Sequence, residues 1–179
     1  MDYHGTVEPL PADLGMTAFY GQDSCLLDAN GRIKLSPHFL SDFRRSGNEV
    51  VLHCLAEGAL GVYPAHAWEQ MRQADAQPAA RAAQSLVFRR QLRRFGALTE
   101  VETITNQGRV TVPVRFRERL GLRPGTEVVV VGCEIGVEIW NAESWQAEAE
   151  LFIEHERQRG TAEMAADLNV VPPRRADEP

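Results

Sequence analysis

Two arginines in this sequence each follow a glycine in matching surroundings. Arg32 follows Gly31 and Arg109 follows Gly108, at an offset of 77 positions. The planar guanidinium fork of arginine fits phosphate oxygens and also the O6 and N7 acceptors of guanine. Glycine has no side chain, so Gly31 and Gly108 would let the backbone approach DNA closely. These two pairs are therefore the candidate DNA contacts.

The residue four positions before each arginine differs between the two pairs. Asp28 precedes Arg32, and Thr105 precedes Arg109. A carboxylate beside DNA would be repelled by phosphate, so we expect Asp28 to brace Arg32 through a charged hydrogen bond. Thr105 can brace Arg109 only weakly, which predicts a more mobile second arginine. The alternative is that both arginines pair with acids across a sheet and are structural.

The same offset extends over about 45 residues, which indicates an internal repeat. Three aromatic positions recur at this offset: Phe39 with Phe116, Tyr63 with Trp140, and Trp68 with Trp145. With a slip of one residue, 49–52 also matches 127–130. Each copy predicts a strand, a tight glycine turn, a second strand, a short helix opened by a proline, a valine-rich hairpin and a helix bearing tryptophan.

A unit of about 45 residues buries too little apolar surface to fold alone. The two copies should therefore share one core. We expect an α+β fold that is mainly β with short helices, in which interleaved strands form one pseudo-twofold body. Phe39, Phe116, Trp68 and Trp145 are expected to anchor this core rather than stack on a ligand.

The chain divides into five predicted segments. They are a flexible N-terminal extension (1–17), a first repeat (18–70), a helical connector (71–98), a second repeat (99–146), and a C-terminal helix with a disordered tail (147–179). Within the connector, 79–95 predicts a helix rich in alanine and arginine. Its arginines could be a solvated face, or could contact nucleic acid or another protein. The stretch 142–168 predicts a second, acidic helix, and 170–179 is expected to be disordered.

The charge distribution permits nucleic-acid binding although the formal net charge is −6. The excess acid lies mostly in 1–17 and 147–179, so the segment 18–146 is close to neutral. Such a body can bind phosphate if its arginines gather on one surface. No stretch has the apolar length of a membrane span, and the first fifteen residues lack the pattern of a secretory signal.

No grouping of side chains predicts catalysis, a metal site or a cofactor. The histidines are scattered, and no glycine-rich phosphate loop ending in Gly-Lys is present. The cysteines form an odd set without paired spacing, which fits free thiols in a reducing cytosol. His53 and Cys54 are neighbours in a predicted strand and so point to opposite faces. We therefore expect a protein that is not an enzyme and uses no metal, cofactor or small-molecule substrate.

The segment 18–146 resembles the MraZ family of bacterial regulators. The matching residues are Phe19-Tyr20-Gly21, Asp28, Gly31-Arg32-Ile33, Tyr63-Pro64 and Trp68 in the first half, and Gly108-Arg109-Val110, Pro113, Val131-Gly132, Glu138-Ile139-Trp140 and Trp145 in the second. The family signature, Asp-x-x-x-Arg, is intact from Asp28 to Arg32. It departs at Thr105, and the proline at Pro37 stands one position later than is usual in the family.

The resemblance implies two tandem AbrB-like swapped-hairpin units. It also implies a cytoplasmic, nucleoid-associated regulator that assembles into a homo-oligomer, possibly a ring. Such an oligomer would bind repeated double-stranded DNA sites in the promoter of division and cell-wall genes, with no membrane contact. Effective concentration would strengthen the binding of several copies to evenly repeated sites.

Two alternatives belong to other functional classes. An antitoxin-like regulator of the same superfamily would also bind DNA and would grip a toxin with its long C-terminal tail. A protein-interaction module would dock a partner on the acidic helix 142–168. In that second case Arg32 and Arg109 would be structural.

Overall fold

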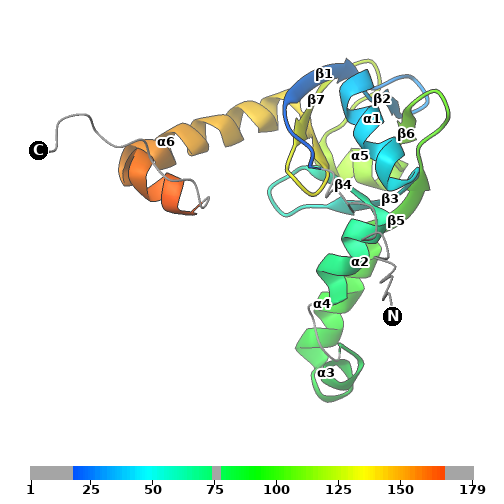
Figure 1. Cartoon of the computed structure of the whole chain (residues 1–179). Coiled ribbons are helices and arrows are strands. Elements are labelled where there is room, and N and C mark those ends of the chain that lie inside the picture. The colour runs from blue at the N-terminus through cyan, green and yellow to red at the C-terminus, as the bar shows by residue number, and fades with distance from the viewer. Residues whose placement is uncertain (1–17, 74–77, 168–179) are drawn as a thin grey trace, which may run out of the picture.

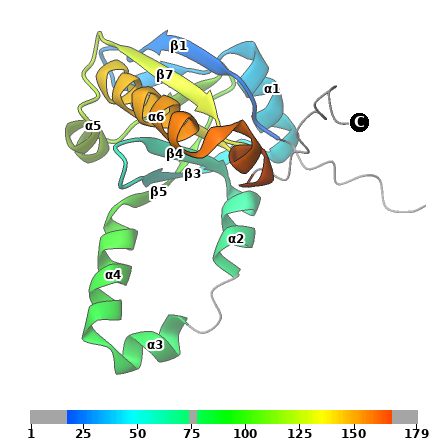
Figure 2. The ribbon, with the colours of Figure 1, turned by 90° about the vertical axis from the view of Figure 1, so that its left-hand side faces the viewer.

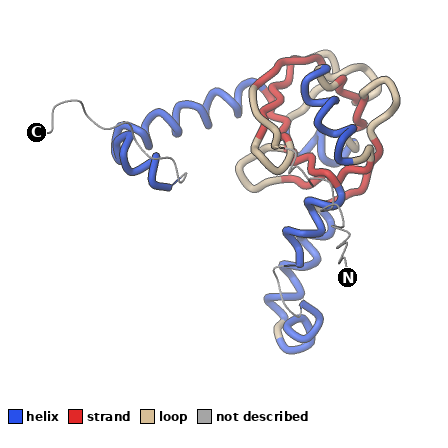
Figure 3. Tube along the Cα trace, viewed as in Figure 1, coloured by secondary structure: helices blue, strands red, loops and turns tan. Residues whose placement is uncertain are grey.

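The structure is a computed structural model that describes residues 18–73 and 78–167. Its strands are β1 (Gln22–Leu26), β2 (Arg32–Lys34), β3 (Glu49–Cys54), β4 (Leu60–Pro64), β5 (Thr99–Thr103), β6 (Arg109–Thr111), β7 (Glu127–Gly132) and β8 (Val137–Asn141). Its helices are α1 (Pro37–Ser46), α2 (Ala65–Gln73), α3 (Pro78–Gln84), α4 (Leu86–Ala97), α5 (Val114–Leu120) and α6 (Ala142–Asp167). The strands and the two short helices α1 and α5 form one body, from which the other helices project (Figure 1 and Figure 3).

The six-stranded sheet exchanges strands between the two copies. Its order is β1-β7-β8-β4-β3-β5, so β1 of the first copy pairs with β7 of the second, and β5 of the second pairs with β3 of the first. At its centre Leu60 lies opposite Ile139, Gly61 opposite Glu138, and Val62 opposite Val137. This register is symmetric at the 77-residue offset. It confirms the interleaved, pseudo-twofold architecture expected from the repeat.

A second exchange joins β2 and β6 into a two-stranded antiparallel ribbon, called here the β2–β6 ribbon. Ile33 lies opposite Val110 at its middle, and both side chains are fully buried. The pseudo-twofold axis passes through this pair because the two residues are equivalent in the repeat. Each copy thus contributes one strand to the ribbon, and neither copy could form it alone.

One core unites the two copies, because apolar residues from both pack into the same cluster. Phe39 and Phe116 are each 1% exposed, which confirms their predicted place in the core. The tryptophans lie nearer the surface. Trp68 is half-buried and stacks on Tyr63 and Phe95, and Trp145 is half-buried against Trp140. Both therefore anchor a projecting helix to the rim of the body rather than to its centre.

The connector forms a helical arm that extends away from the sheet (Figure 2). The expectation of a single helix over 79–95 was wrong, because Ser85 interrupts the helix between α3 and α4. The Ser85 hydroxyl accepts the Phe88 N–H at 3.2 Å and caps the start of α4. A serine that satisfies a free backbone N–H in this way begins a new helix.

Helix α6 runs outward from the body, as Figure 1 shows, and fits the predicted C-terminal helix. The Asn141 side chain caps its start by accepting the Ser144 N–H at 2.8 Å. Gly160, with φ +75°, interrupts the helical backbone. The expected flexible extension at 1–17 and disordered tail at 170–179 lie outside the described residues.

Candidate nucleic-acid interface

The first glycine turn is held together by the Asp28 carboxylate. Its Oδ1 accepts the N–H groups of Asn30 at 2.8 Å and Arg32 at 2.9 Å, and its Oδ2 accepts Nε of Arg32 at 3.1 Å. The backbone closes the same loop, since the Asp28 N–H donates to the Arg32 carbonyl at 2.8 Å. Asp28 therefore fixes both the turn and the direction of the Arg32 side chain.

These bonds also set the charge of Asp28. The hydrogen bond from the Arg32 N–H, with smaller contributions from the Asn30 N–H and the Arg32 guanidinium, holds the pKa of Asp28 below its ordinary value. The group is therefore a carboxylate at neutral pH. Its exposed ion pair with Arg32 acts mainly by orienting the guanidinium, because solvent screens the attraction.

The second turn has the same backbone but lacks the side-chain brace. The Thr105 N–H donates to the Arg109 carbonyl at 3.0 Å, and the Thr105 hydroxyl accepts the Arg109 N–H at 3.0 Å. One hydroxyl oxygen replaces two carboxylate oxygens, so no acceptor is left for the guanidinium. In the described part of the chain, the Arg109 side chain has no hydrogen-bond or ion-pair partner.

The structure itself requires glycine at both turns, apart from any approach to DNA. Gly31 and Gly108 have φ of +74° and +76°, a region that favours glycine. A Cβ on Gly31 would lie 2.4 Å from Cζ of Arg117, and one on Gly108 would lie 2.7 Å from Cδ2 of Leu40. Each turn is thus covered by a side chain from the helix of the other copy.

The ribbon register places the candidate arginines on one face. Arg32 lies opposite Thr111, and Lys34 lies opposite Arg109. Opposed residues share a face, and residues two apart on a strand share it as well, while Ile33 and Val110 point into the core. Arg32, Lys34 and Arg109 therefore project together from the outer face of the ribbon. Among the described residues, no acid across the ribbon pairs with them.

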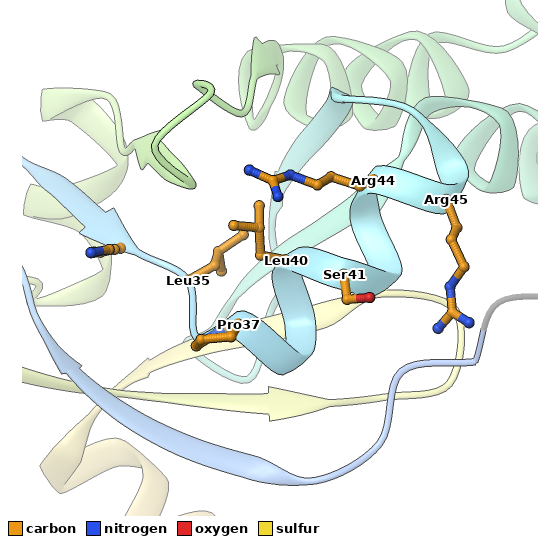
Figure 4. A pocket seen from close by; sticks show the side chains of 7 residues that line it. Leu35, Pro37, Leu40, Ser41, Arg44 and Arg45 are labelled. Carbon is orange, nitrogen blue, oxygen red and sulfur yellow. The ribbon is translucent and has the colours of Figure 1, made fainter.

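Two grooves lie at equivalent places of the two copies, and the first borders the ribbon at Lys34. The first groove is lined by Lys34, Leu35, Pro37, Leu40, Ser41, Arg44 and Arg45, mostly from α1 (Figure 4). The second groove is lined by Val114, Arg117 and Glu118 of α5 and by Gly121, Leu122, Arg123 and Pro124 of the segment that follows it. At the 77-residue offset, the α1 residues of the first groove correspond to lining residues of the second in α5 and just after it, but their charges differ.

Two basic residues of the first groove were missed in the sequence. Lys34 follows Arg32 by two positions in an alternating strand, so strand periodicity alone places it on the same face. Arg44 carried no such signal. Its Nη2 donates to the Asn106 carbonyl at 3.0 Å, a contact between residues far apart in the sequence.

The three cysteines are free and lie in surroundings that keep their thiols protonated. Burial raises the pKa of the Cys25, Cys54 and Cys133 thiols, that of Cys133 to about 11, so all three are protonated and poorly nucleophilic at neutral pH. Throughout residues 18–73 and 78–167, no three His, Cys, Asp or Glu side chains gather in a way that could hold a metal ion. None of the described helices combines the length and apolar character needed to cross a bilayer.

Comparison with known proteins matches this architecture. A family model described as "MraZ protein, putative antitoxin-like" matches residues 18–90 and 97–168, one match for each copy of the repeat. A protein of Thermomicrobium roseum named transcriptional regulator MraZ is 32% identical over 134 residues, which cover 75% of this chain and 89% of that protein. A relative with the same name from Lachnoclostridium phytofermentans is 31% identical, over 72% of this chain and 85% of its own length. Another, from Desulforamulus reducens, is 32% identical, over 73% of this chain and 90% of its own length.

Proposed function

Since this chain belongs to the MraZ family of transcriptional regulators, we propose that it binds specific double-stranded DNA sites through the outer face of the β2–β6 ribbon. The observation that carries the proposal is the shared face of Arg32, Lys34 and Arg109 at the pseudo-twofold axis. The major groove of DNA is wide enough to admit a two-stranded β-ribbon. A ribbon with basic outward residues fits that groove.

The arginines and glycines divide the contacts. Arg32 and Arg109 meet phosphates or fork onto guanine O6 and N7, and each correct base contact adds roughly 1–3 kcal/mol of discrimination. Gly31 and Gly108 keep the backbone of the two turns close to the DNA. Asp28 and Thr105 support the turns by accepting their backbone N–H groups, and Asp28 does not face phosphate, because a carboxylate there would be repelled.

One body offers few base contacts, so we propose that a homo-oligomer binds repeated promoter sites. Helix α6 supports this step, because Leu151, Phe152 and Ile153 are 65%, 54% and 51% exposed on a helix that extends from the body. Exposed apolar side chains on a projecting helix are candidates for a protein contact. A ring of copies on evenly spaced repeats gains affinity through effective concentration. By analogy with the family, the sites control division and cell-wall genes, and the protein is cytoplasmic and nucleoid-associated.

Fluorescence anisotropy with labelled DNA tests the proposal. The probe is DNA from the gene's own upstream region, with a scrambled duplex as reference, over a salt series. The wild type should prefer its own repeats and weaken steeply with salt, as counterion release requires. The folded Arg32→Ala/Arg109→Ala double variant should lose binding. Arg157→Ala, which removes one charge from the exposed face of α6, should keep the preference. A wild type with neither preference nor salt dependence would refute DNA binding.

An antitoxin-like role is the second candidate, because the matching family model carries that description and α6 exposes apolar side chains. In that case the outward part of α6 binds a toxin while the ribbon still binds DNA. A toxin gene beside this one, and co-purification of its product with the chain, would support this role. Neighbouring cell-wall genes and a chain that purifies without a partner favour the first.

A further inference from the structure

Resting on the proposed DNA binding, we infer that the two glycine turns do different work. The second turn, with Lys34 and Arg44, is a phosphate clamp that supplies sequence-independent affinity. The first turn, with Arg32 braced by Asp28, supplies base discrimination. The inference follows from charges and contacts that break the pseudo-twofold symmetry at four equivalent pairs of positions.

Three cations surround the second turn. The Arg109 guanidinium has no acceptor on Thr105, and Lys34 lies directly opposite Arg109 on the ribbon. Arg44 is tied to the turn itself by its 3.0 Å bond to the Asn106 carbonyl. Figure 4 shows the Arg44 side chain extending from α1 among the residues that line the first groove. A neutral carbonyl does not cancel the charge of Arg44, so all three positive charges stay available.

The charged groups around the first turn differ from those around the second. Thr111 occupies the position equivalent to Lys34, and Gly121 the position equivalent to Arg44. Arg117 replaces Leu40 over the turn and adds a second cation, which packs on Gly31 with its Nε buried and without a hydrogen-bond partner among the described residues. The Asp28 carboxylate lies against Arg32 at 3.1 Å.

Two acids outside the ribbon, Asp23 and Asp42, lie near residues of the clamp. Asp23 borders a depression together with Lys34, yet the two side chains form no ion pair within 4.0 Å. Asp42, on the same helix as Arg44, is buried and paired with Arg45. Neither carboxylate is therefore bound to a clamp cation, whereas the carboxylate of the first turn is bound to its arginine.

These two balances suit two kinds of contact. Attraction to phosphate depends on the number of uncompensated cations and tolerates loose side chains. A bidentate contact to guanine requires an oriented guanidinium, and a locked supporting shell provides that orientation. The loss of the second Asp-x-x-x-Arg acid at Thr105 is thus a gain of net charge at the clamp rather than a defect of the motif.

The test compares salt slopes with sequence preference in the full-length chain. In Lys34→Gln/Arg44→Gln the negative slope of log Kobs against log salt should become shallower by about 2, because two phosphate contacts are lost. Its preference for the upstream repeats over scrambled DNA should stay near that of the wild type. Asp28→Asn should do the opposite, with a large loss of preference and a slope close to that of the wild type. Arg157→Gln is the matched control for loss of charge.

A third variant keeps the test informative if the double variant is unstable. Thr105→Asp supplies the missing acid. The salt slope should become shallower by about 1, while the preference for the upstream repeats over scrambled DNA should rise. The inference is overturned if the clamp variants match Arg157→Gln in slope, or if they lose preference and keep the slope. A wild type without any salt dependence would instead remove the proposed DNA binding on which the inference rests.

Discussion

Alanine substitution of the two turn glycines tests whether their backbone and their helix contacts are both needed. Gly31 and Gly108 have nearly the same φ, +74° and +76°, so both variants carry the cost of a left-handed alanine, about 1–2 kcal/mol. Gly125 has φ +82°, and no atom lies within 4 Å of the place that a Cβ would take there, so Gly125→Ala carries the backbone cost alone. It is the matched control.

The contacts then separate the two variants. The new methyl of Gly31→Ala meets the far end of the flexible Arg117 side chain, which can move. The methyl of Gly108→Ala meets Leu40, which packs against the core and can give way less. Overpacking of this kind costs about 1–3 kcal/mol more. We expect Gly31→Ala to match Gly125→Ala, and Gly108→Ala to be the least stable of the three.

Urea unfolding followed by circular dichroism measures these differences. For a chain of this size each kcal/mol also lowers the midpoint of thermal unfolding by roughly 2–4 °C. Equal losses for Gly108→Ala and Gly125→Ala would refute the steric part of the reasoning. Wild-type stability in all three would refute the cost of the left-handed backbone.

Three further predictions concern the turn, the arm and α6. Burial, and then the charge of Arg72, lower the pKa of His53, which contacts Trp68, Phe95 and the Thr99 hydroxyl. Because the unfolded chain then binds a proton more readily than the folded protein, the free energy of unfolding should fall as the pH drops below about 6.5. In His53→Gln this part of the pH dependence should be absent from urea titrations. The lowered pKa of Asp28 means that its brace is present above its unfolded pKa and is lost as the pH falls through the folded value. In Asp28→Asn, NMR of the Arg32 Nε–H should therefore show no acid transition, whereas the wild type should show one. Replacing Leu151, Phe152 and Ile153 with glutamine should reduce the oligomer seen by light scattering without lowering thermal stability, since these side chains are exposed; an unchanged mass would exclude this surface as the subunit contact.

Several features of the fold follow from local patterns. The glycine turns, the proline-led helix α1 and the valine-rich strands β3 and β7 are all visible in the repeat. The exchange of strands was also expected, because a copy of about 45 residues cannot bury enough apolar surface alone. The break at Ser85 was missed although a helix cap is a local signal. The alanine-rich segment before it and the arginine-rich segment after it both favour helix, and this masked the break.

Part of the candidate site was also visible in local residue types and spacing. Gly31, Arg32, Gly108 and Arg109 are marked by residue type and spacing, and the ribbon register then places both arginines on one face. Lys34 was within reach of strand periodicity. Arg44 was not, because its contact with Asn106 joins helix α1 of one copy to the turn of the other.

Residue types and their 77-residue spacing thus carried the repeat, the fold class and the paired arginines, because turns, periodicity and the shortage of core in a single copy are local or compositional properties. Tertiary structure decided which helix covers which turn, which cations remain unpaired and how the two halves differ. Leu40 over Gly108, Arg117 over Gly31 and Arg44 beside Asn106 are contacts between the two copies. Their partners are set by the crossing of the chains at the pseudo-twofold axis, and sequence spacing does not encode that geometry.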